Sequence, residues 1–198
     1  MLGSVAHTMR HIIELDYLCA EGEIIYEPHR TSINRLDQTH FLLSHKPLFA
    51  GSHVLELGCG DSYIRELKSQ LGYAAYIGVD SRPDSRADEI VDFNSLEFEA
   101  FLNTISPYDC VISFQQMPVD LGPLHSYMSS DGYLIHQSTP RWYNKNHIHA
   151  RIANHFHLIE KINYRINITG GTLEHTITNL FVVGKSRTSD TAAPSQKR

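Results

Sequence analysis

One segment, residues 54–80, constrains the fold of this 198-residue chain more than any other. It reads as a short apolar strand, a Gly-x-Gly turn at residues 58–60, a helix, and a second strand that ends at Asp80. Asp80 follows Gly60 by 20 residues, which is the spacing found in nucleotide-binding βαβ units. In such units the glycines let the backbone approach the ligand, and the carboxylate accepts hydrogen bonds from the ribose. A glycine turn alone often serves helix packing, so the prediction rests on the combination.

After residue 53 the sequence alternates short apolar runs with segments of helical periodicity, a pattern typical of a parallel sheet with crossover helices. The predicted strands cover residues 54–57, 75–79, 90–93, 110–114, 132–138, 158–168 and 177–183. The last two flank Gly170-Gly171 and are predicted to form an antiparallel hairpin. We therefore predict an α/β protein, a Rossmann-like three-layer sandwich with a mostly parallel seven-stranded sheet and an antiparallel C-terminal hairpin strand.

The chain divides into three predicted segments. Residues 1–50 form an N-terminal helical cap or lid segment, residues 51–185 form the sheet domain, and the polar residues 186–198 form a disordered tail. The helical spacing in the first segment rests on two sets of residues, Met9, Ile12 and Ile13, and then Ile33, Leu36, His40 and Leu43.

Composition narrows the class of protein further. The 17 basic and 22 acidic residues give a net charge of −5, which argues against binding to duplex nucleic acid through a global basic footprint. Three cysteines, Cys19, Cys59 and Cys110, are odd in number and widely spaced, so they cannot form a complete disulfide framework. No apolar run is long enough for a membrane span or a signal sequence. We expect a cytoplasmic protein that has no membrane partner.

The residues beside the glycine turn bear on which nucleotide fits. A dinucleotide pyrophosphate favours a third glycine and an uncharged helix N-terminus, whereas this chain has Asp61 and Tyr63 there. Glu56 brings a further carboxylate to the same region. A ligand with an adenosine, a cationic end and no phosphate therefore fits these charges better than NAD does.

At these residues the chain resembles the class I S-adenosylmethionine-dependent methyltransferases. The sequence VLELGCGDS at residues 54–62 matches their first motif, E/D-x-G-x-G-x-G, except that Ser62 replaces the last glycine. The sequence IGVD ends at Asp80, and VDF at 91–93 and YDCVISF at 108–114 match later parts of the family pattern. The resemblance covers residues 50–185 or so and implies S-adenosyl-L-methionine as the cofactor.

The resemblance also implies cofactor-binding roles for individual residues. Gly58 and Gly60 would let the methionine part approach the backbone, and Glu56 would help to orient its amino group. Cys59 stands between the two glycines, at a position that the motif leaves free. Asp80 would bind the ribose.

Three further residues are implied at the adenine and the sulfonium. Asp92 would accept from the adenine amino group, and the Phe93 backbone would meet the ring. Phe114, at the end of the fourth predicted strand, would lie near the cofactor amine and sulfonium. The alternative is that Phe114 is a core aromatic residue that does not contact the cofactor.

Substrate residues are expected outside the carboxyl ends of the strands. Gln115 follows the fourth predicted strand, while Trp142 and Tyr143 follow the fifth and either wall an aromatic pocket or simply pack. Upstream, Tyr26, His29 and Arg30 form a loop that either folds over the cofactor or connects two helices.

His136 is the predicted catalytic base, because it lies near the end of a strand and histidine titrates near neutrality. The alternative is a hydrogen-bonded strand histidine. The histidine pairs at 147/149 and 155/157 invite a metal interpretation, but residues at i and i+2 point to different faces of a helix. No metal site is predicted.

The predicted activity is methyl transfer from S-adenosyl-L-methionine to an oxygen or nitrogen atom of a small molecule. We expect a small substrate because little of the chain, beyond the first 50 residues and the segment after the fifth strand, is left to recognise a macromolecule. One alternative is an RNA or protein methyltransferase that uses the basic stretch at 139–166. A second is a non-catalytic cofactor-binding partner or regulator.

Overall fold

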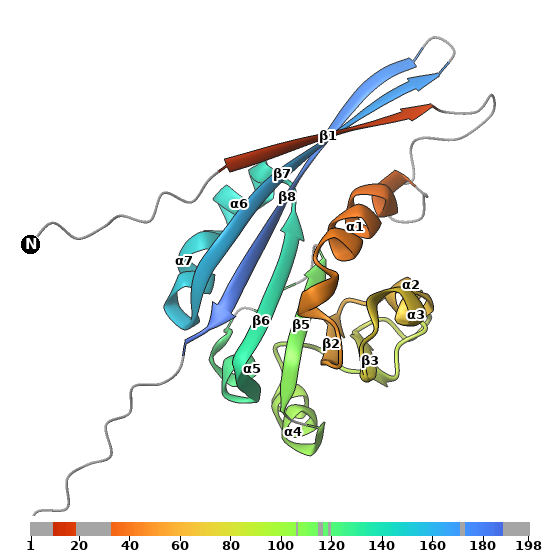
Figure 1. Ribbon diagram of the computed structural model, residues 1–198. Helices are drawn as coiled ribbons and strands as arrows, with labels where there is room; N and C mark the ends of the chain where they lie inside the picture. Colours follow the sequence, from red (N-terminus) through yellow and green to blue (C-terminus); the bar gives the residue numbers. More distant parts are fainter. Residues whose placement is uncertain are drawn as a thin grey trace, which may run out of the picture.

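The computed structural model describes residues 10–18, 33–105, 107–114, 117–118, 120–170 and 173–187. They form one eight-stranded sheet with helices on both faces (Figure 1). The strands are β1 (Arg10–Leu18), β2 (His53–Leu57), β3 (Ala75–Asp80), β4 (Glu89–Ile90), β5 (Tyr108–Phe114), β6 (Met128–Ser138), β7 (Phe156–Gly170) and β8 (Leu173–Ser186). The helices are α1 (Ile33–Ser44), the 3-10 turn η1 (Lys46–Leu48), α2 (Tyr63–Glu66), α3 (Lys68–Leu71), α4 (Leu96–Ile105), α5 (Gly122–Ser126), α6 (Pro140–Lys145) and α7 (Ile148–His155). In this described part, no helix is both long and apolar enough to cross a membrane.

The strand order is β1-β7-β8-β6-β5-β2-β3-β4. Strand pairs are parallel except where β8 inserts between β6 and β7, where both pairings are antiparallel. The predicted α/β class, the mostly parallel sheet and the antiparallel hairpin strand are therefore confirmed. The sheet has eight strands where the sequence pattern predicted seven, and β1 is the additional strand.

β1 corrects the prediction of a helix near residues 9–13. Ile13 and Leu15 pack against the core, whereas Ile12 is 60% exposed and Glu14 is exposed. This alternation has the period of a strand. The helix prediction arose because Met9, Ile12 and Ile13 stand at i, i+3 and i+4, although Ile12 and Ile13 point to opposite faces of the strand. β1 pairs in parallel with β7, and Arg165 of β7 donates to Glu14 at 2.8 Å.

The sheet separates two apolar cores. The first lies under α4 to α7, on what we call the α7 face of the sheet, and the second lies under α1 to α3, on the α1 face. An aromatic cluster fixes the second core, because Phe41 of α1 stacks on Phe181 of β8 with ring centroids 4.5 Å apart. Phe114 and Tyr164 meet Phe181 edge-on, at centroid distances of 5.9 and 5.0 Å.

Helix α1 buries a different face from the one predicted. Of the positions predicted to be its apolar face, Leu43 is 41% exposed and His40 is exposed. The buried positions are instead Asp37, Gln38, Phe41 and Leu42. The helix turns polar residues inward because the strands beneath it present polar side chains beside Phe181, as described below.

Candidate functional site

The glycine turn follows β2 and is tied to the end of β3. Gly58 and Gly60 have φ angles of +72° and +57°, in the left-handed region that glycine occupies without strain. The backbone N–H groups of Gly58 and Cys59 both donate to the Val79 carbonyl, at 2.8 and 3.2 Å. The turn is thereby held against the carboxyl end of the neighbouring strand.

Cys59 packs beneath this turn. A Cβ atom on Gly78 would lie 2.9 Å from the Cys59 sulfur and 2.8 Å from the Tyr76 hydroxyl, so β3 has a glycine where the turn crosses it. The Cys59 side chain is buried, and this burial raises the pKa of its thiol to about 11. Its observed contacts are those of a packing residue.

Asp80, the ribose-binding candidate, closes the glycine turn. Asp80 is 5% exposed, and its Oδ2 accepts from the Gly60 N–H at 2.9 Å. Its Oδ1 accepts from the Arg82 backbone N–H at 2.9 Å, and the Arg82 Nε lies 3.4 Å from the same oxygen. The Arg82 side chain is more than half exposed and reaches over Gly60.

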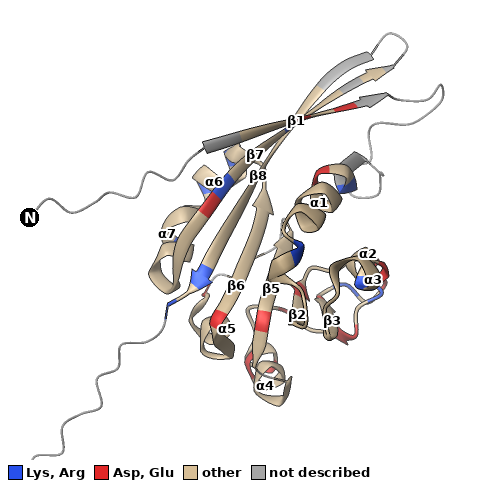
Figure 2. Ribbon diagram, in the orientation of Figure 1, with Lys and Arg blue, Asp and Glu red and all other residues tan. Residues whose placement is uncertain are grey.

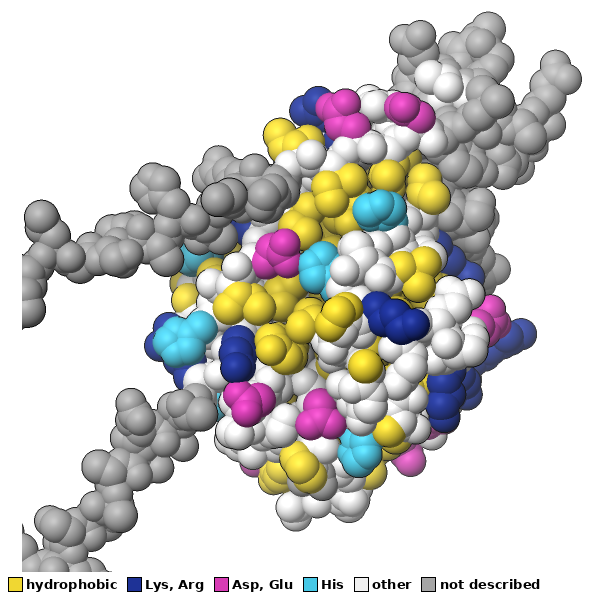
Figure 3. All heavy atoms as spheres, viewed as in Figure 1, with side chains coloured by type: hydrophobic (Ala, Val, Ile, Leu, Met, Phe, Trp, Pro, Cys, Tyr) yellow, Lys and Arg dark blue, Asp and Glu magenta, His cyan; other side chains and the backbone are white. Residues whose placement is uncertain are grey.

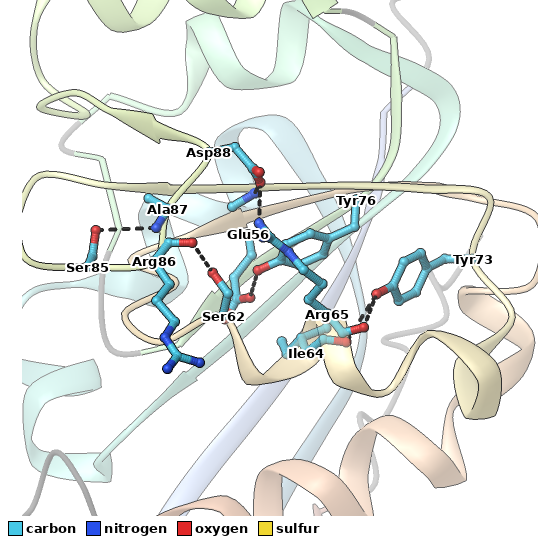
Figure 4. Close-up of polar contacts among 11 residues, drawn as sticks. Glu56, Ser62, Ile64, Arg65, Tyr73, Tyr76, Ser85, Arg86, Ala87 and Asp88 are labelled. Atoms are coloured by element: carbon cyan, nitrogen blue, oxygen red, sulfur yellow. Dashed lines mark hydrogen bonds and ion pairs between the residues drawn. The ribbon is translucent and has the colours of Figure 1, made fainter.

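Glu56 is buried next to the turn (Figure 4). Its Oε2 accepts from the Tyr76 hydroxyl at 2.5 Å. Burial raises the pKa of the Glu56 carboxyl to about 8. The loop before β4 is fixed nearby, because Arg65 of α2 pairs with Asp88 at 2.6 Å and Asp88 also accepts from the Gly78 N–H at 2.8 Å (Figure 4).

The raised pKa of Glu56 predicts how stability depends on pH. The folded state holds this proton more tightly than the unfolded state, so the contribution is fully present below pH 4.5 and is lost as the pH rises through about 8. We expect Glu56→Gln to remove this loss. As the pH rises from 5 to 8, the urea concentration at the unfolding midpoint should therefore increase in the variant relative to the wild type. Parallel pH profiles for the two proteins would contradict the assignment.

Asp92 and Phe93 lie on the segment that follows β4. The Val91 N–H donates to the Asp80 carbonyl at 3.0 Å, which places this segment beside the ribose-binding candidate. Asp92 is exposed, and its Oδ1 accepts from the Asn94 backbone N–H at 2.9 Å. Phe93 is 9% exposed and packs edge-on against Phe98.

Phe114 ends β5 at the same level as the glycine turn. The strand register aligns Leu57 with Ser113, and Phe114 with Gln137 of β6, so Gly58, Phe114 and Gln137 lie on neighbouring strands at the carboxyl edge. β2 and β5 are adjacent here, with α2 and α3 packed on one face of the sheet and α4 on the other. This is a topological switch point, where open α/β sheets bind ligands.

Comparison with known proteins identifies the fold. No protein-family model matches the sequence, and no curated protein matches it. Among solved structures, the precorrin-6y C5,15-methyltransferase of Geobacter metallireducens is 10% identical with a TM-score of 0.54, over 77% of this chain and 87% of that one. The N-methyltransferase NodS of Bradyrhizobium japonicum, solved with S-adenosyl-L-homocysteine, is 12% identical with a TM-score of 0.53, over 81% and 91%. A SAM-dependent methyltransferase of Archaeoglobus fulgidus is 16% identical with a TM-score of 0.52, over 77% and 94%.

This chain has the class I methyltransferase fold. The glycine turn, Asp80 and the Asp92 segment occupy consecutive carboxyl ends of its sheet, on β2, β3 and β4. The structure thus brings together the residues that the sequence assigned to the cofactor.

His136 lies on the α7 face of the methyltransferase sheet and is fully buried. Its Nδ1 is 3.4 Å from the Ser113 hydroxyl, and its ring packs at 5.8 Å from that of Trp142. Burial lowers the pKa of His136 to about 3, so the ring is neutral at pH 7 and is a weak base. The geometry therefore suits a structural histidine better than the predicted general base.

The two aromatic residues of α6 differ in exposure. Trp142 is partly exposed, and its backbone N–H donates to the Thr139 hydroxyl at the helix N-terminus. Tyr143 is buried, with its hydroxyl 3.3 Å from His149 Nδ1. Tyr143 is thus a core residue, and Trp142 is the member of the pair that can reach a ligand. The other substrate candidates, Tyr26, His29, Arg30 and Gln115, lie outside the described residues.

Several basic residues of the 139–166 stretch make contacts within the protein. Arg151 donates to the Pro118 carbonyl, Arg165 pairs with Glu14, and the Lys161 ammonium lies 4.7 Å from the centre of the Tyr143 ring. On the face seen in Figure 3, Lys and Arg side chains are interspersed with acidic and apolar ones. These contacts weaken the argument for an extended basic nucleic-acid surface.

Helix α1 contributes residues that the sequence analysis missed. Its Arg35 forms an ion pair with Asp61 of the glycine turn and lies 4.8 Å over the Tyr63 ring. Figure 2 shows charged residues of both signs around α1, α2 and α3. One sequence signal could have revealed the buried face of α1. Asp37 stands four residues before Phe41 and therefore lies on the same helix face as that aromatic residue.

Proposed function

We propose that this protein transfers a methyl group from S-adenosyl-L-methionine to a nitrogen or oxygen atom of a small molecule. The observation that carries the proposal is the glycine turn at the topological switch point, with the Asp80 carboxylate bonded to the Gly60 N–H. Arg151 and Lys161 are engaged within the protein and Arg165 is paired with Glu14 at the surface, which leaves less positive charge for RNA and favours a small acceptor. The described chain also has the fold of proteins that use this cofactor.

The residues around the turn fit the cofactor in charge and in shape. Gly58 and Gly60 would place backbone without side chains next to the methionine part, and Asp80, which already accepts from the Gly60 N–H, would accept from the ribose hydroxyls. Glu56 would be the counter-charge for the cofactor's ammonium group, and binding that cation would lower the pKa of this buried carboxyl. Arg82 would swing outward from Gly60 to admit the ribose, because its side chain is largely exposed.

Adenine recognition falls to the Asp92 segment, and methyl transfer depends mainly on positioning. Asp92 would accept from the adenine amino group, and the Phe93 backbone would meet the ring. When bound, the cofactor supplies an electrophilic methyl on a sulfonium. The protein's task is to hold an acceptor lone pair in line with that methyl at near-attack distance.

Binding can be tested by thermal unfolding with three ligands. At about 100 times the dissociation constant, S-adenosyl-L-methionine or S-adenosyl-L-homocysteine should stabilise the protein by about 2.7 kcal/mol. For a domain of this size, such a gain raises the melting temperature by about 5–10 °C. NAD should give no rise, and an equal rise with NAD would overturn the cofactor assignment.

Transfer is tested separately with the methyl-labelled cofactor. Purified protein is incubated with labelled S-adenosyl-L-methionine and with small-molecule, RNA and protein extracts of the source cells. We expect label in the small-molecule fraction. Label in RNA or protein would favour those acceptors instead, and bound cofactor with no transfer to any fraction would indicate a non-catalytic cofactor-binding protein.

A further inference from the structure

A group of buried polar side chains lies between α1 and the α1 face of the sheet. We call it the α1 polar cluster: Asp37 and Gln38 of α1, Gln137 of β6 and Asn179 of β8. Asn179 Nδ2 donates to Asp37 Oδ2 at 2.7 Å, and Gln38 Nε2 lies 3.4 Å from Gln137 Oε1. All four residues are at most 8% exposed. Burial of polar side chains costs free energy unless each of their polar atoms is hydrogen-bonded.

The cluster lies at the same edge of the sheet as the glycine turn. Gln137 is aligned with Phe114, which in turn stands at the level of Gly58 across β5 and β2. The first turn of α1 reaches that turn directly, because Arg35 pairs with Asp61. The α1 polar cluster therefore flanks the cofactor candidates on the side where β5 and β6 end.

Two buried polar groups at this place have no hydrogen-bond partner in the described part of the chain. They are Gln137 Nε2 and the Tyr63 hydroxyl. Burial of an unpaired amide or hydroxyl costs about 1–3 kcal/mol. Gln137 is 1% exposed, so bulk water does not supply the missing partner. A bound molecule with an acceptor atom would supply it.

The charges of the cluster select the kind of molecule. Tyr63 of α2 and Tyr164 of β7 interact electrostatically with Asp37, and Asn179 contacts it from β8. The Tyr164 hydroxyl is in turn 3.0 Å from Nδ1 of His40 on α1. Among the described residues, no Lys or Arg side chain is paired with Asp37, so an anionic ligand would meet a carboxylate that has no ion-pair partner. Burial raises the pKa of Asp37 to about 6, so the group is a carboxylate at pH 7 and accepts a proton more readily than an exposed aspartate.

We propose that the α1 polar cluster binds the methyl acceptor and that this acceptor is a small amine or amide. The Asp37 carboxylate accepts a hydrogen bond from the N–H of the acceptor, and Gln137 Nε2 donates one to an oxygen atom of the acceptor next to that nitrogen. The proposal rests on the function proposed above. The acceptor nitrogen forms a bond to the methyl carbon while the carbon–sulfur bond breaks, and its electron pair returns to sulfur as the neutral thioether. The nitrogen's proton passes to the Asp37 carboxylate and then to solvent. Because α1 covers the cluster, the helix must shift to admit the acceptor, and this shift breaks the exposed Arg35–Asp61 ion pair and changes the packing of Phe41 on Phe181.

The test measures labelled methyl transfer into a metabolite extract separated by ion exchange into cationic, neutral and anionic pools. The wild-type chain should label the cationic and neutral pools at least tenfold more than the anionic pool. Asp37→Asn should lose at least tenfold of that transfer while binding S-adenosyl-L-homocysteine with unchanged affinity. The control Asp109→Asn makes the same change at the opposite end of β5, where Asp109 accepts from the His53 N–H, and should transfer normally.

The pH profile gives a readout that a structural role would not move. The wild-type kcat/KM for the labelled acceptor should rise with pH through about 6, because Asp37 must be deprotonated, and this limb should vanish in Asp37→Asn. A second variant, Gln137→Leu, removes the unpaired Nε2 and also the Oε1 atom that lies 3.4 Å from Gln38 Nε2, so the two effects offset and the melting temperature should change by less than about 3 °C while KM rises at least tenfold.

Other outcomes overturn the inference. Label confined to the anionic pool or to RNA would exclude the cluster as the acceptor site. Full transfer by Asp37→Asn with an unchanged pH dependence would exclude it too. Both outcomes would leave the methyltransferase proposal intact. Bound cofactor without transfer to any pool would remove both.

Discussion

Replacing Asp80 with alanine is expected to weaken the binding of S-adenosyl-L-methionine about 100-fold, which corresponds to about 3 kcal/mol. The variant loses two acceptor oxygens at once, and hydrogen bonds to a charged group are each worth about 1.5 kcal/mol or more. It also loses the bond from Asp80 Oδ2 to the Gly60 N–H, which holds the glycine turn. Isothermal titration of the wild type and the variant measures the effect.

The matched control is Asp84→Ala, in the exposed loop that follows β3. It removes the same charge a few residues away and should change the dissociation constant less than twofold. Circular dichroism and urea unfolding establish that the Asp80 variant is folded when its affinity is measured. An affinity equal to that of the wild type would exclude Asp80 from the ribose site.

Truncation of Phe181 to alanine is expected to lower the free energy of unfolding by about 3–5 kcal/mol, the range for large-to-small changes of buried aromatic residues. Phe181 is fully buried, stacks on Phe41 of α1 and meets Phe114 and Tyr164 edge-on. The cavity would lie beneath α1, so the variant should lose a large share of the stability of a typical domain. Urea unfolding followed by circular dichroism measures the change.

Two controls separate cavity formation from general sensitivity. Phe181→Leu keeps most of the volume and should cost less than half as much. Ile159→Ala removes a half-exposed side chain from β7 and should change the free energy of unfolding by less than about 1 kcal/mol. A loss below 1 kcal/mol in Phe181→Ala would mean that the aromatic cluster does not anchor α1.

The geometry of the cofactor candidates could be predicted because their contacts are local. Gly60 and Asp80, which the hydrogen bond at 2.9 Å joins, are 20 residues apart and belong to one βαβ unit. Residues 54–80 contain the glycine pattern, the strand periodicity and the terminal carboxylate. Local chemistry therefore carries enough information to place this edge of the site.

The other half depends on distant partners. Asp37 and Asn179 are 142 residues apart, and Gln38 and Gln137 are 99 apart. Nothing near α1 in sequence says that the helix will meet polar side chains, so the apolar positions around Leu43 indicated the wrong buried face. His136 was chosen for its residue type and its place at a strand end, and neither reveals which sheet face the side chain enters or how deeply it is buried.

The placement of β1 has a consequence for the timing of folding during synthesis. Glu14 and its partner Arg165 are 151 residues apart, so at about 5–20 residues per second a ribosome needs about 8–30 s to make the second after the first. Even then β7 joins the sheet through β8, which is made later and stands between β7 and β6. β1, the first strand of the described residues, is therefore expected to dock after β2, β3 and β5 have already paired.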